Sequence, residues 1–270
     1  MAKKAAFIGL TNIDYVYYLK SFPEENNKCK TGEYSKYIGG PAANAAITYA
    51  ALGGDATLIT AIGTSDDSKI IAHTLESYNV KLINVAKDKK LPGISTICIS
   101  DNGKRTIISG QNSFEEIDLG DVCPDEYDFA LFDCNQQDIA VPLLNKITCD
   151  VVLDAGSYKE NTDKFLAKAK IAITSEQFKD NQGRNIFQMS FPNIEYMAIT
   201  RGEKSILTEN GEIMVNPVEC VDSLAAGDIF HGAFCYAYYE KNMPFDPALE
   251  YAAKVASESV KYKGPRGWIH

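Results

Sequence analysis

Asp222-Ser223-Leu224-Ala225-Ala226-Gly227-Asp228 is a turn of small residues between two carboxylates, and it leads directly into an apolar helical segment, Ile229 to Phe234. Small side chains let a backbone approach an anion closely, and the first turn of a helix offers unpaired N–H groups at its positive dipole end. The stretch therefore predicts a phosphate-binding turn. Asp228 has two interpretations: an acidic residue that favours a helix N-terminus, or a general base beside a phosphoryl group in transfer.

Strands and helices alternate along the rest of the chain. Predicted strands are 5–9, 56–62, 129–132, 151–153, 171–173 and 196–199, and predicted helices are 42–52, 67–78, 139–146, 161–168, 227–239 and 247–260. This alternation predicts an α/β fold with a doubly wound, mostly parallel sheet, formed by residues 1–270 as one domain. Ligands of such sheets bind outside the carboxyl ends of the strands, where Asp14, Gly40, Asp133 and Asp228 are expected.

The turn resembles the C-terminal signature of the ribokinase-like (PfkB) carbohydrate kinases, Asp-Thr-x-Gly-Ala-Gly-Asp. Ser223 takes the place of the usual threonine and keeps its hydroxyl, whereas Ala225 stands where the family prefers glycine. Alanine is disfavoured there only if the backbone needs a positive φ. Near the other end of the chain, Asn12-Ile13-Asp14 and the run from Gly39 to Asn44 also match the family. Within it, the pattern is most similar to ketohexokinase and sulfofructose kinase-like members.

The resemblance implies a role for each matching position. Asp228 would be the general base, and the backbone amides of Ala225, Ala226 and Gly227 would hold the transferred phosphoryl group. Substrate-binding positions implied by the resemblance are Asn12, Asp14, Gly39, Gly40, Asn44 and Arg105. Taken singly, Asp14 could cap a turn, Gly39 and Gly40 could form a plain loop, and Asn44 could be a solvated helix residue; their joint occurrence in family order favours the substrate site.

The nucleotide side of the resemblance is less complete. Thr200 and Gly202 match a stretch that approaches the ATP phosphates, although Ser205 replaces its last glycine. The usual Asn-x-x-Glu is missing, and Ser175 and Glu176 stand in that region. The family implies ATP and Mg²⁺ as cofactors, with Gly264 near the nucleotide and K⁺ bound beside Asp222 and Ser223.

Two stretches interrupt the alternation, at about 15–37 and 93–110. The second has β-branched runs on either side of Asp101-Asn102-Gly103-Lys104, which predicts a hairpin with an Asn-Gly turn. Together the stretches are expected to form a small β-sheet lid, which in this family excludes water from the reaction and in many relatives serves as a homodimer face. The tyrosines at 15, 17, 18, 34 and 37 would form an exposed aromatic face or pack against the back of the lid.

Composition excludes several classes of partner. A net charge of −9 argues against a nucleic-acid surface, and the longest early apolar run, Ala5 to Leu10, is too short for a signal peptide core or a membrane span. We expect a cytoplasmic protein. Seven cysteines without a Cys-x-x-Cys pair suggest neither a disulfide framework nor a zinc site. His231 is interpreted as a packing residue.

The sequence thus predicts an ATP-dependent kinase acting on a small sugar of ketose or pentose type. The segment Asp133-Cys134-Asn135-Gln136 contains no basic side chain for a charged substituent, which favours a neutral sugar. The alternatives are a nucleoside kinase of the same scaffold and a sensor that binds sugar or nucleotide without catalysis, which Ala225 and the missing Asn-x-x-Glu would favour. A dinucleotide-dependent dehydrogenase is disfavoured because no Gly-x-Gly-x-x-Gly follows a predicted strand.

Overall fold

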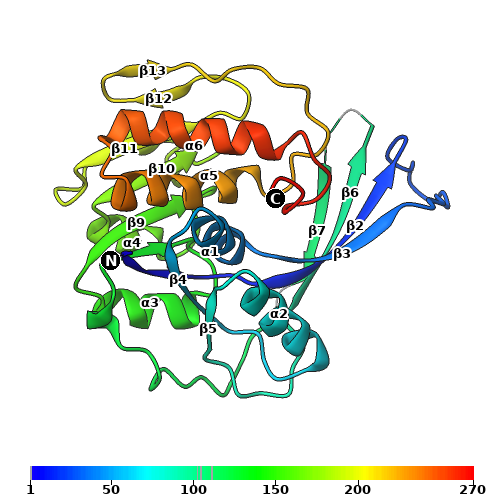
Figure 1. The fold of residues 1–270 in the computed structure, drawn as a ribbon, viewed down its shortest axis with the longest axis horizontal. Helices are drawn as coiled ribbons and strands as arrows, with labels where there is room; N and C mark the ends of the chain where they lie inside the picture. The colour runs from blue at the N-terminus through cyan, green and yellow to red at the C-terminus, as the bar shows by residue number, and fades with distance from the viewer. Residues whose placement is uncertain (1, 102, 104, 111) are drawn as a thin grey trace.

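A large sheet with helices on both faces forms the body of the protein, and a small separate sheet projects from it (Figure 1). The computed structural model describes residues 2–101, 103, 105–110 and 112–270. The strands of the large sheet are, in spatial order, β13 (Gly211–Ile213), β12 (Ile206–Thr208), β11 (Tyr196–Thr200), β10 (Ile171–Ser175), β9 (Asp150–Ala155), β8 (Phe129–Phe132), β1 (Lys4–Ile8), β4 (Asp55–Thr60) and β5 (Lys81–Asn84). All pairs from β11 to β5 are parallel, whereas β12 and β13 join one edge antiparallel. The predicted doubly wound α/β fold is confirmed.

The two faces of the large sheet are covered by different helices. Successive side chains of a strand point to opposite faces, so Ala5 and Phe7 of β1 belong to one core and Ala6 and Ile8 to the other. On the first face lie α1 (Pro41–Ala51), α2 (Asp66–Ser77), α5 (Ala226–Cys235) and α6 (Phe245–Ser259), and on the second lie α3 (Gln137–Lys146) and α4 (Thr162–Lys168). With both faces covered, the central strands are apolar throughout, as in β8.

Most predicted elements are found within a few residues of their predicted bounds. The helix predicted to end at Tyr239 instead leaves regular α geometry after Cys235 and continues as a π-helical turn, Tyr236–Glu240. Sequence analysis did not identify β5 or the β12–β13 hairpin. Short 3₁₀ turns, Pro124–Glu126 and Ile186–Gln188, complete the secondary structure described.

The small sheet is built from the two stretches that interrupt the alternation. Its order is β3 (Tyr34–Gly39), β2 (Asn12–Leu19), β6 (Gly93–Ser100) and β7 (Arg105–Gly110), with a parallel β2–β6 pair between two antiparallel pairs. One face packs on the body of the protein, where Val16, Ile97 and Ile99 contact Leu224 of the turn before α5. The hairpin turn predicted at 101–104 includes Asn102 and Lys104, which lie outside the described residues.

Helices α1 and α5 approach each other closely because Gly232 has no side chain. A Cβ atom at Gly232 would lie 2.3 Å from the carbonyl oxygen of Ala45 and 2.8 Å from the Cβ atom of Thr48. Both neighbours belong to α1, whose residues Ala42 to Tyr49 are buried, so neither can move without disturbing the core. The contact fixes the position of α5, and with it the turn that precedes α5.

We expect Gly232→Ala to lower the free energy of unfolding by about 2 kcal/mol, because overpacking a close-packed core forces backbone shifts. Urea unfolding followed by circular dichroism measures the change. Gly32→Ala is the matched control, since a Cβ atom there meets nothing within 4 Å. Equal stability of the two variants would contradict the close packing of α1 on α5.

Candidate active site

The carboxylate of Asp133 joins three segments at the point where the order of strands reverses. The chain runs outward from β1 to β4 on one side and from β8 to β11 on the other, so the carboxyl ends of β1 and β8 form the switch point where ligands of such sheets bind. Asp133 follows β8 directly; its Oδ2 accepts hydrogen bonds from the amides of Leu10 (2.9 Å) and Ala42 (3.1 Å), and its Oδ1 accepts one from Asn135 (2.8 Å). The start of α1 is thereby fixed beside the end of β1.

A polar cluster lies where β1 passes into the small sheet. The Asn12 amide donates to Asp14 Oδ1 at 2.9 Å and to Ser95 Oγ at 2.7 Å, while the buried Asn12 Oδ1 has no hydrogen-bond partner among the described residues. Gly39 packs closely against Asn12 and Asp14. A Cβ atom at Gly39 would be 1.9 Å from Asp14 Oδ2, so no larger residue fits there without a shift. Burial raises the pKa of Asp14 to about 6, although the hydrogen bond from Asn12 and the charge of Arg266 lower it. The cluster holds one acceptor without a partner and one carboxyl group that titrates near neutrality.

A second group connects this cluster to Asp228. Asn44, in the first turn of α1, donates to Asp228 Oδ2 at 2.7 Å, and its Oδ1 accepts from Arg266 Nη2 at 2.9 Å. Arg266 also donates to the carbonyl of Ile38 at 2.6 Å, and the charges of both Asp14 and Asp228 act on it. Gly40 precedes α1 with φ 96°, and a Cβ atom there would be 2.2 Å from the Leu10 carbonyl. Two carboxylates and one guanidinium therefore share this part of the site.

Asp228 lies in the first turn of α5, close to two other ionisable groups, Asp154 and His231. Burial raises its pKa to about 7, assisted by the negative charge of Asp154, whereas the hydrogen bond from Asn44 lowers it. Asp154, at the end of β9, is buried, and its pKa is raised to about 8. A carboxyl group that titrates near pH 7 is suited to accept a proton from an alcohol.

His231 packs beneath the turn and contacts its backbone. Its Nδ1 lies 2.8 Å from the Gly227 carbonyl and 3.3 Å from Asp154 Oδ2, and its Nε2 lies 3.4 Å from the Ile173 carbonyl. Burial lowers the pKa of the imidazole. His231 therefore does more than pack in the core. Its ring also links the turn to Asp154 of the central sheet.

The turn itself has the geometry of an anion site. Ala225 adopts the left-handed conformation, φ 63° and ψ 9°, at the N-cap of α5. The Ala226 amide makes a long bond to the Ser223 carbonyl at 3.3 Å, while the amides of Ala225 and Gly227 have no hydrogen-bond partner in the described part of the chain. Their unused donors lie at the positive end of the α5 dipole.

The small sheet closes over this turn through Arg105. Its guanidinium donates to the Ser223 carbonyl, and the Ser223 hydroxyl donates to the Gly103 carbonyl at 3.3 Å. Arg105 thus lies beside the turn and not in the Asn12–Asp14 cluster.

Asp222 and Ser223 tie the turn to the small sheet and to the C-terminal segment. The carboxylate of Asp222 accepts hydrogen bonds from the amides of Leu224 (2.8 Å) and Gly264 (2.9 Å) and from the Tyr18 hydroxyl (3.0 Å). The Ser223 carbonyl already faces the Arg105 guanidinium. Both carboxylate oxygens of Asp222 and the carbonyl oxygen of Ser223 therefore already accept hydrogen bonds, and K⁺ binding beside them stays a prediction. Gly264 ties the C-terminal segment to Asp222 instead.

A largely apolar cavity of about 320 Å³ opens beside the turn. Thr200 and Gly202 line one side, Ala226 and Gly227 line the end nearest the turn, and Phe230 and Val260 contribute apolar surface. Ser175 and Glu176 lie outside this lining: the Ser175 hydroxyl donates to Gly156 at 2.6 Å, and Glu176 pairs with Lys204 at 3.4 Å. An apolar cavity whose end is lined by Gly227, with an amide that has no partner among the described residues, can hold the base and sugar of a nucleotide with its phosphates at the turn.

Sequence reasoning missed Arg266 and Asp154. Arg266 lies in the run Gly264-Pro265-Arg266-Gly267, and its guanidinium connects β3 to α1. Asp154 is the acidic residue that ends an apolar strand, a position at which a carboxyl group is available to a ligand site. No group of three or more His, Cys, Asp or Glu side chains able to hold a metal ion occurs among the described residues.

Fold and site together define a small-molecule kinase of the ribokinase-like class. The chain belongs to the pfkB family of carbohydrate kinases, because the model of that family matches residues 2–133 and 164–269. It is therefore an ATP-dependent phosphotransferase. No helix in the described residues has both the length and the apolar character needed to cross a membrane.

Known proteins similar to this chain are sugar and nucleoside kinases. A ribokinase of Haemophilus influenzae is 24% identical over all of this chain and 96% of its own length. A nucleoside kinase of Methanocaldococcus jannaschii is 20% identical, with 97% of this chain and 92% of the relative covered. The crystal structure of ribokinase from Cryptococcus neoformans in complex with ADP matches all of this chain and 97% of its own, at 19% identity and a TM-score of 0.80.

We expect Ala225→Gly to raise the free energy of unfolding by about 1 kcal/mol, because a left-handed conformation is costly for alanine and free of that cost for glycine. Thermal and urea unfolding measure it. Ala226→Gly is the matched control: this neighbour is helical, so glycine there lowers stability or leaves it unchanged. A loss of stability in Ala225→Gly would contradict the left-handed turn.

Proposed function

We propose that the protein transfers the γ-phosphoryl group of ATP to a hydroxyl of a small sugar, with Asp228 as the general base. The observation that carries the proposal is the position of Asp228, which lies one residue after the free amide of Gly227 and accepts a hydrogen bond from Asn44. A base and an anion site are thus adjacent, as transfer to an alcohol requires.

The acceptor sugar is oriented by the polar groups on the other side of Asn44. Asp14 accepts hydrogen bonds from sugar hydroxyls, and Asn12 Oδ1, buried without a partner in the described chain, accepts another. Gly39 and Gly40 leave room for the sugar and the backbone to approach. Arg266 holds Asn44 by a hydrogen bond of 2.9 Å and offsets the charges of Asp14 and Asp228.

The phosphates lie at the turn, where the amides of Ala225 and Gly227 meet the charge that develops on the γ-phosphoryl oxygens. The apolar cavity lined by Thr200 and Gly202 takes the nucleoside part of ATP. Mg²⁺ is bound mainly by phosphates and water; the exposed carboxylate of Glu176, with Ser175 next to it, fits a contact through water. When bound, the ion supplies positive charge to the phosphates.

The small sheet, residues 15–37 and 93–110 with their flanks, acts as a lid. Its inner apolar residues pack on Leu224, and Arg105 reaches the turn at Ser223. A closed lid excludes water, which would otherwise compete with the sugar as acceptor.

With ATP as its phosphoryl donor, we place the enzyme in the cytoplasm.

A coupled ADP-release assay with Mg-ATP, with and without K⁺, tests the activity against ribose, deoxyribose, fructose and a set of nucleosides. Release that depends on a sugar supports the proposal. Release that depends only on nucleosides would replace it with a nucleoside kinase, for which the 20% identical relative is a precedent. ATP binding without release for any acceptor would point to a sensor.

Asp228→Asn tests the base. The amide keeps the hydrogen-bonding shape but cannot accept the proton, so we expect turnover to fall by about 10²- to 10⁴-fold while ATP affinity stays within a factor of about 3. In the parent enzyme the acid limb of kcat/KM should lie near pH 7, because Asp228 is active only after its raised pKa of about 7 is passed. Asp66→Asn, exposed on α2, is the control; normal turnover in Asp228→Asn would refute the assignment.

We further propose that two lids pair in a homodimer. Ile108 of the edge strand β7 is 71% exposed and Tyr34 of the opposite edge strand is 68% exposed, which is unusual for large apolar side chains on a small sheet.

Ile108→Lys should therefore shift the protein from dimer to monomer, because a buried unpaired ammonium is costly at an interface. Light scattering after size-exclusion chromatography measures the mass. Ile70→Lys on α2, where the isoleucine is 46% exposed, is the control. A monomeric parent protein, or a dimer unaffected by Ile108→Lys, would contradict lid pairing.

A further inference from the structure

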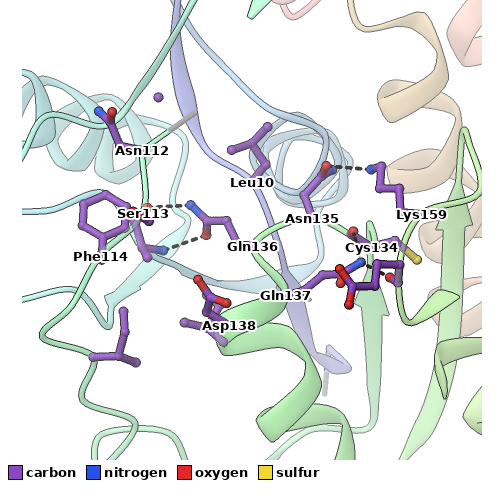
Figure 2. A pocket seen from close by; sticks show the side chains of 15 residues that line it. Leu10, Asn112, Ser113, Phe114, Cys134, Asn135, Gln136, Gln137, Asp138 and Lys159 are labelled. Carbon is purple, nitrogen blue, oxygen red and sulfur yellow. Dashed lines mark hydrogen bonds between the residues drawn. The ribbon is translucent and has the colours of Figure 1, made fainter. Parts of the chain in front are cut away.

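A second and larger cavity lies at the same edge of the large sheet, outside the groups assigned to the reaction. Its volume is about 490 Å³, and it lies at the carboxyl ends of β1, β4 and β8. Figure 2 shows Asn112, Ser113 and Phe114 on one side, and Asn135 and Lys159 on the other. The first side is the chain that follows β7 of the small sheet, and the second is the loop from β8 to α3 with the segment after β9.

This cavity borders the polar cluster assigned to the acceptor. Leu10 and Gly93 line it, and Gly93 is the residue paired across the strands with Asn12. Leu10 is two residues before Asn12, and its amide is held by Asp133 at 2.9 Å. A sugar held by Asn12 and Asp14 therefore lies next to the cavity, and a substituent on that sugar can extend into it.

The wall on the β8–α3 side is rigid. Gln136 binds Ala61 twice, accepting from its amide at 2.9 Å and donating to its carbonyl at 2.6 Å, and the Asn135 side chain donates to the Asp133 carbonyl at 3.2 Å. Cys134 and Gln136 both have positive φ, 57° and 43°, a conformation kept only where the surroundings enforce it. This wall of the cavity is thus fixed by hydrogen bonds within the protein.

Four polar residues that line the cavity, Asn112, Ser113, Asp138 and Glu160, are exposed, so their polar atoms are open to water or to a ligand. Among the described residues, no donor reaches Asn112 Oδ1 or the carboxylates of Asp138 and Glu160, and the Ser113 hydroxyl has no partner. Lys159 donates one bond to Asn135 Oδ1 at 2.6 Å, which leaves two of its three N–H groups. Phe114 and Leu10 add apolar surface. Carboxylates, amides and an ammonium around one apolar face match a polyol, whose hydroxyls both donate and accept.

The charge of the lining and the volume of the cavity indicate which kind of substituent fits there. The lining has two carboxylates and one ammonium, so its net charge does not favour an anionic substituent. Lys159 is a basic side chain of the kind that residues 133–136 lack. Asp14 does not line this cavity, so a single pentose or hexose held there leaves its volume of about 490 Å³ open to a substituent. A planar base is less suited, because Phe114 has no second aromatic ring opposite it in the described lining.

We propose that the acceptor carries a second, polyhydroxylated unit that occupies this cavity, so that the substrate is a glycoside or disaccharide. The inference rests on the proposed sugar kinase activity and specifies its substrate class. The unit that receives the phosphoryl group lies at Asn12, Asp14 and Asn44, and the second unit lies between Phe114 and Lys159.

Steady-state kinetics that compare disaccharides with their free sugars test this inference. Maltose, sucrose and cellobiose are compared with free glucose and fructose in the parent protein, Phe114→Ala and Phe22→Ala, the last being a matched exposed phenylalanine remote from the cavity. We expect at least one disaccharide to have kcat/KM about 10-fold or more above its free sugars. Phe114→Ala should raise KM for that disaccharide by about 10-fold and leave KM for the free sugar within about 2-fold.

Titration calorimetry with the same disaccharides separates this inference from the proposed function. Binding that is weakened by Phe114→Ala, without ADP release, would support the cavity and refute the kinase activity. Phosphorylation of free sugars that is equal to or better than that of disaccharides, unaffected by Phe114→Ala, would refute the inference alone. A nucleoside whose KM depends on Phe114 would also refute it, because the second unit would then be a base.

Discussion

Three hydrogen bonds to the carboxylate of Asp133 determine where everything else in the site can lie. They hold the end of β1, the start of α1 and the β8–α3 loop at one point, and a Cβ atom at Gly9 would come within 2.0 Å of the carboxylate. Backbone amides at the switch point would otherwise be exposed or unpaired, at a cost of about 1–3 kcal/mol each if buried. The small sheet projects from this point, and the cavity at the carboxyl ends of β1, β4 and β8 opens beside it.

The site concentrates carboxyl groups of raised pKa in a small, partly buried region. Asp14, Asp154 and Asp228 titrate at about 6, 8 and 7, in each case mainly because burial disfavours the charged form. Each such group binds its proton more tightly in the folded than in the unfolded chain. Its contribution to stability is therefore fully present below its ordinary pKa and is lost as pH rises through the raised value. Arg266 limits this loss, because its charge acts on both Asp14 and Asp228.

The turn before α5 is held from three directions. His231 contacts the Gly227 carbonyl from below, Asn44 binds Asp228 from α1, and the small sheet reaches Ser223 and Leu224 from above. Ala225 stays in a left-handed conformation in spite of its side chain, which these contacts enforce. The position at which the family signature has glycine is therefore a site of stored strain in this chain.

The fold class and the bounds of most elements could be predicted from the sequence, because they follow from periodicity and from glycine and small-residue patterns that act over a few neighbouring residues. Which charges meet could not be predicted in this way. Arg266 is 222 residues from Asn44, and Asp154 is 77 residues from His231, so no local pattern indicates either pair. The same holds for Asp222, whose carboxylate accepts hydrogen bonds from β2 and from the C-terminal segment. Hydrogen bonds and desolvation depend on distances in space, which a linear sequence specifies only after the chain has folded.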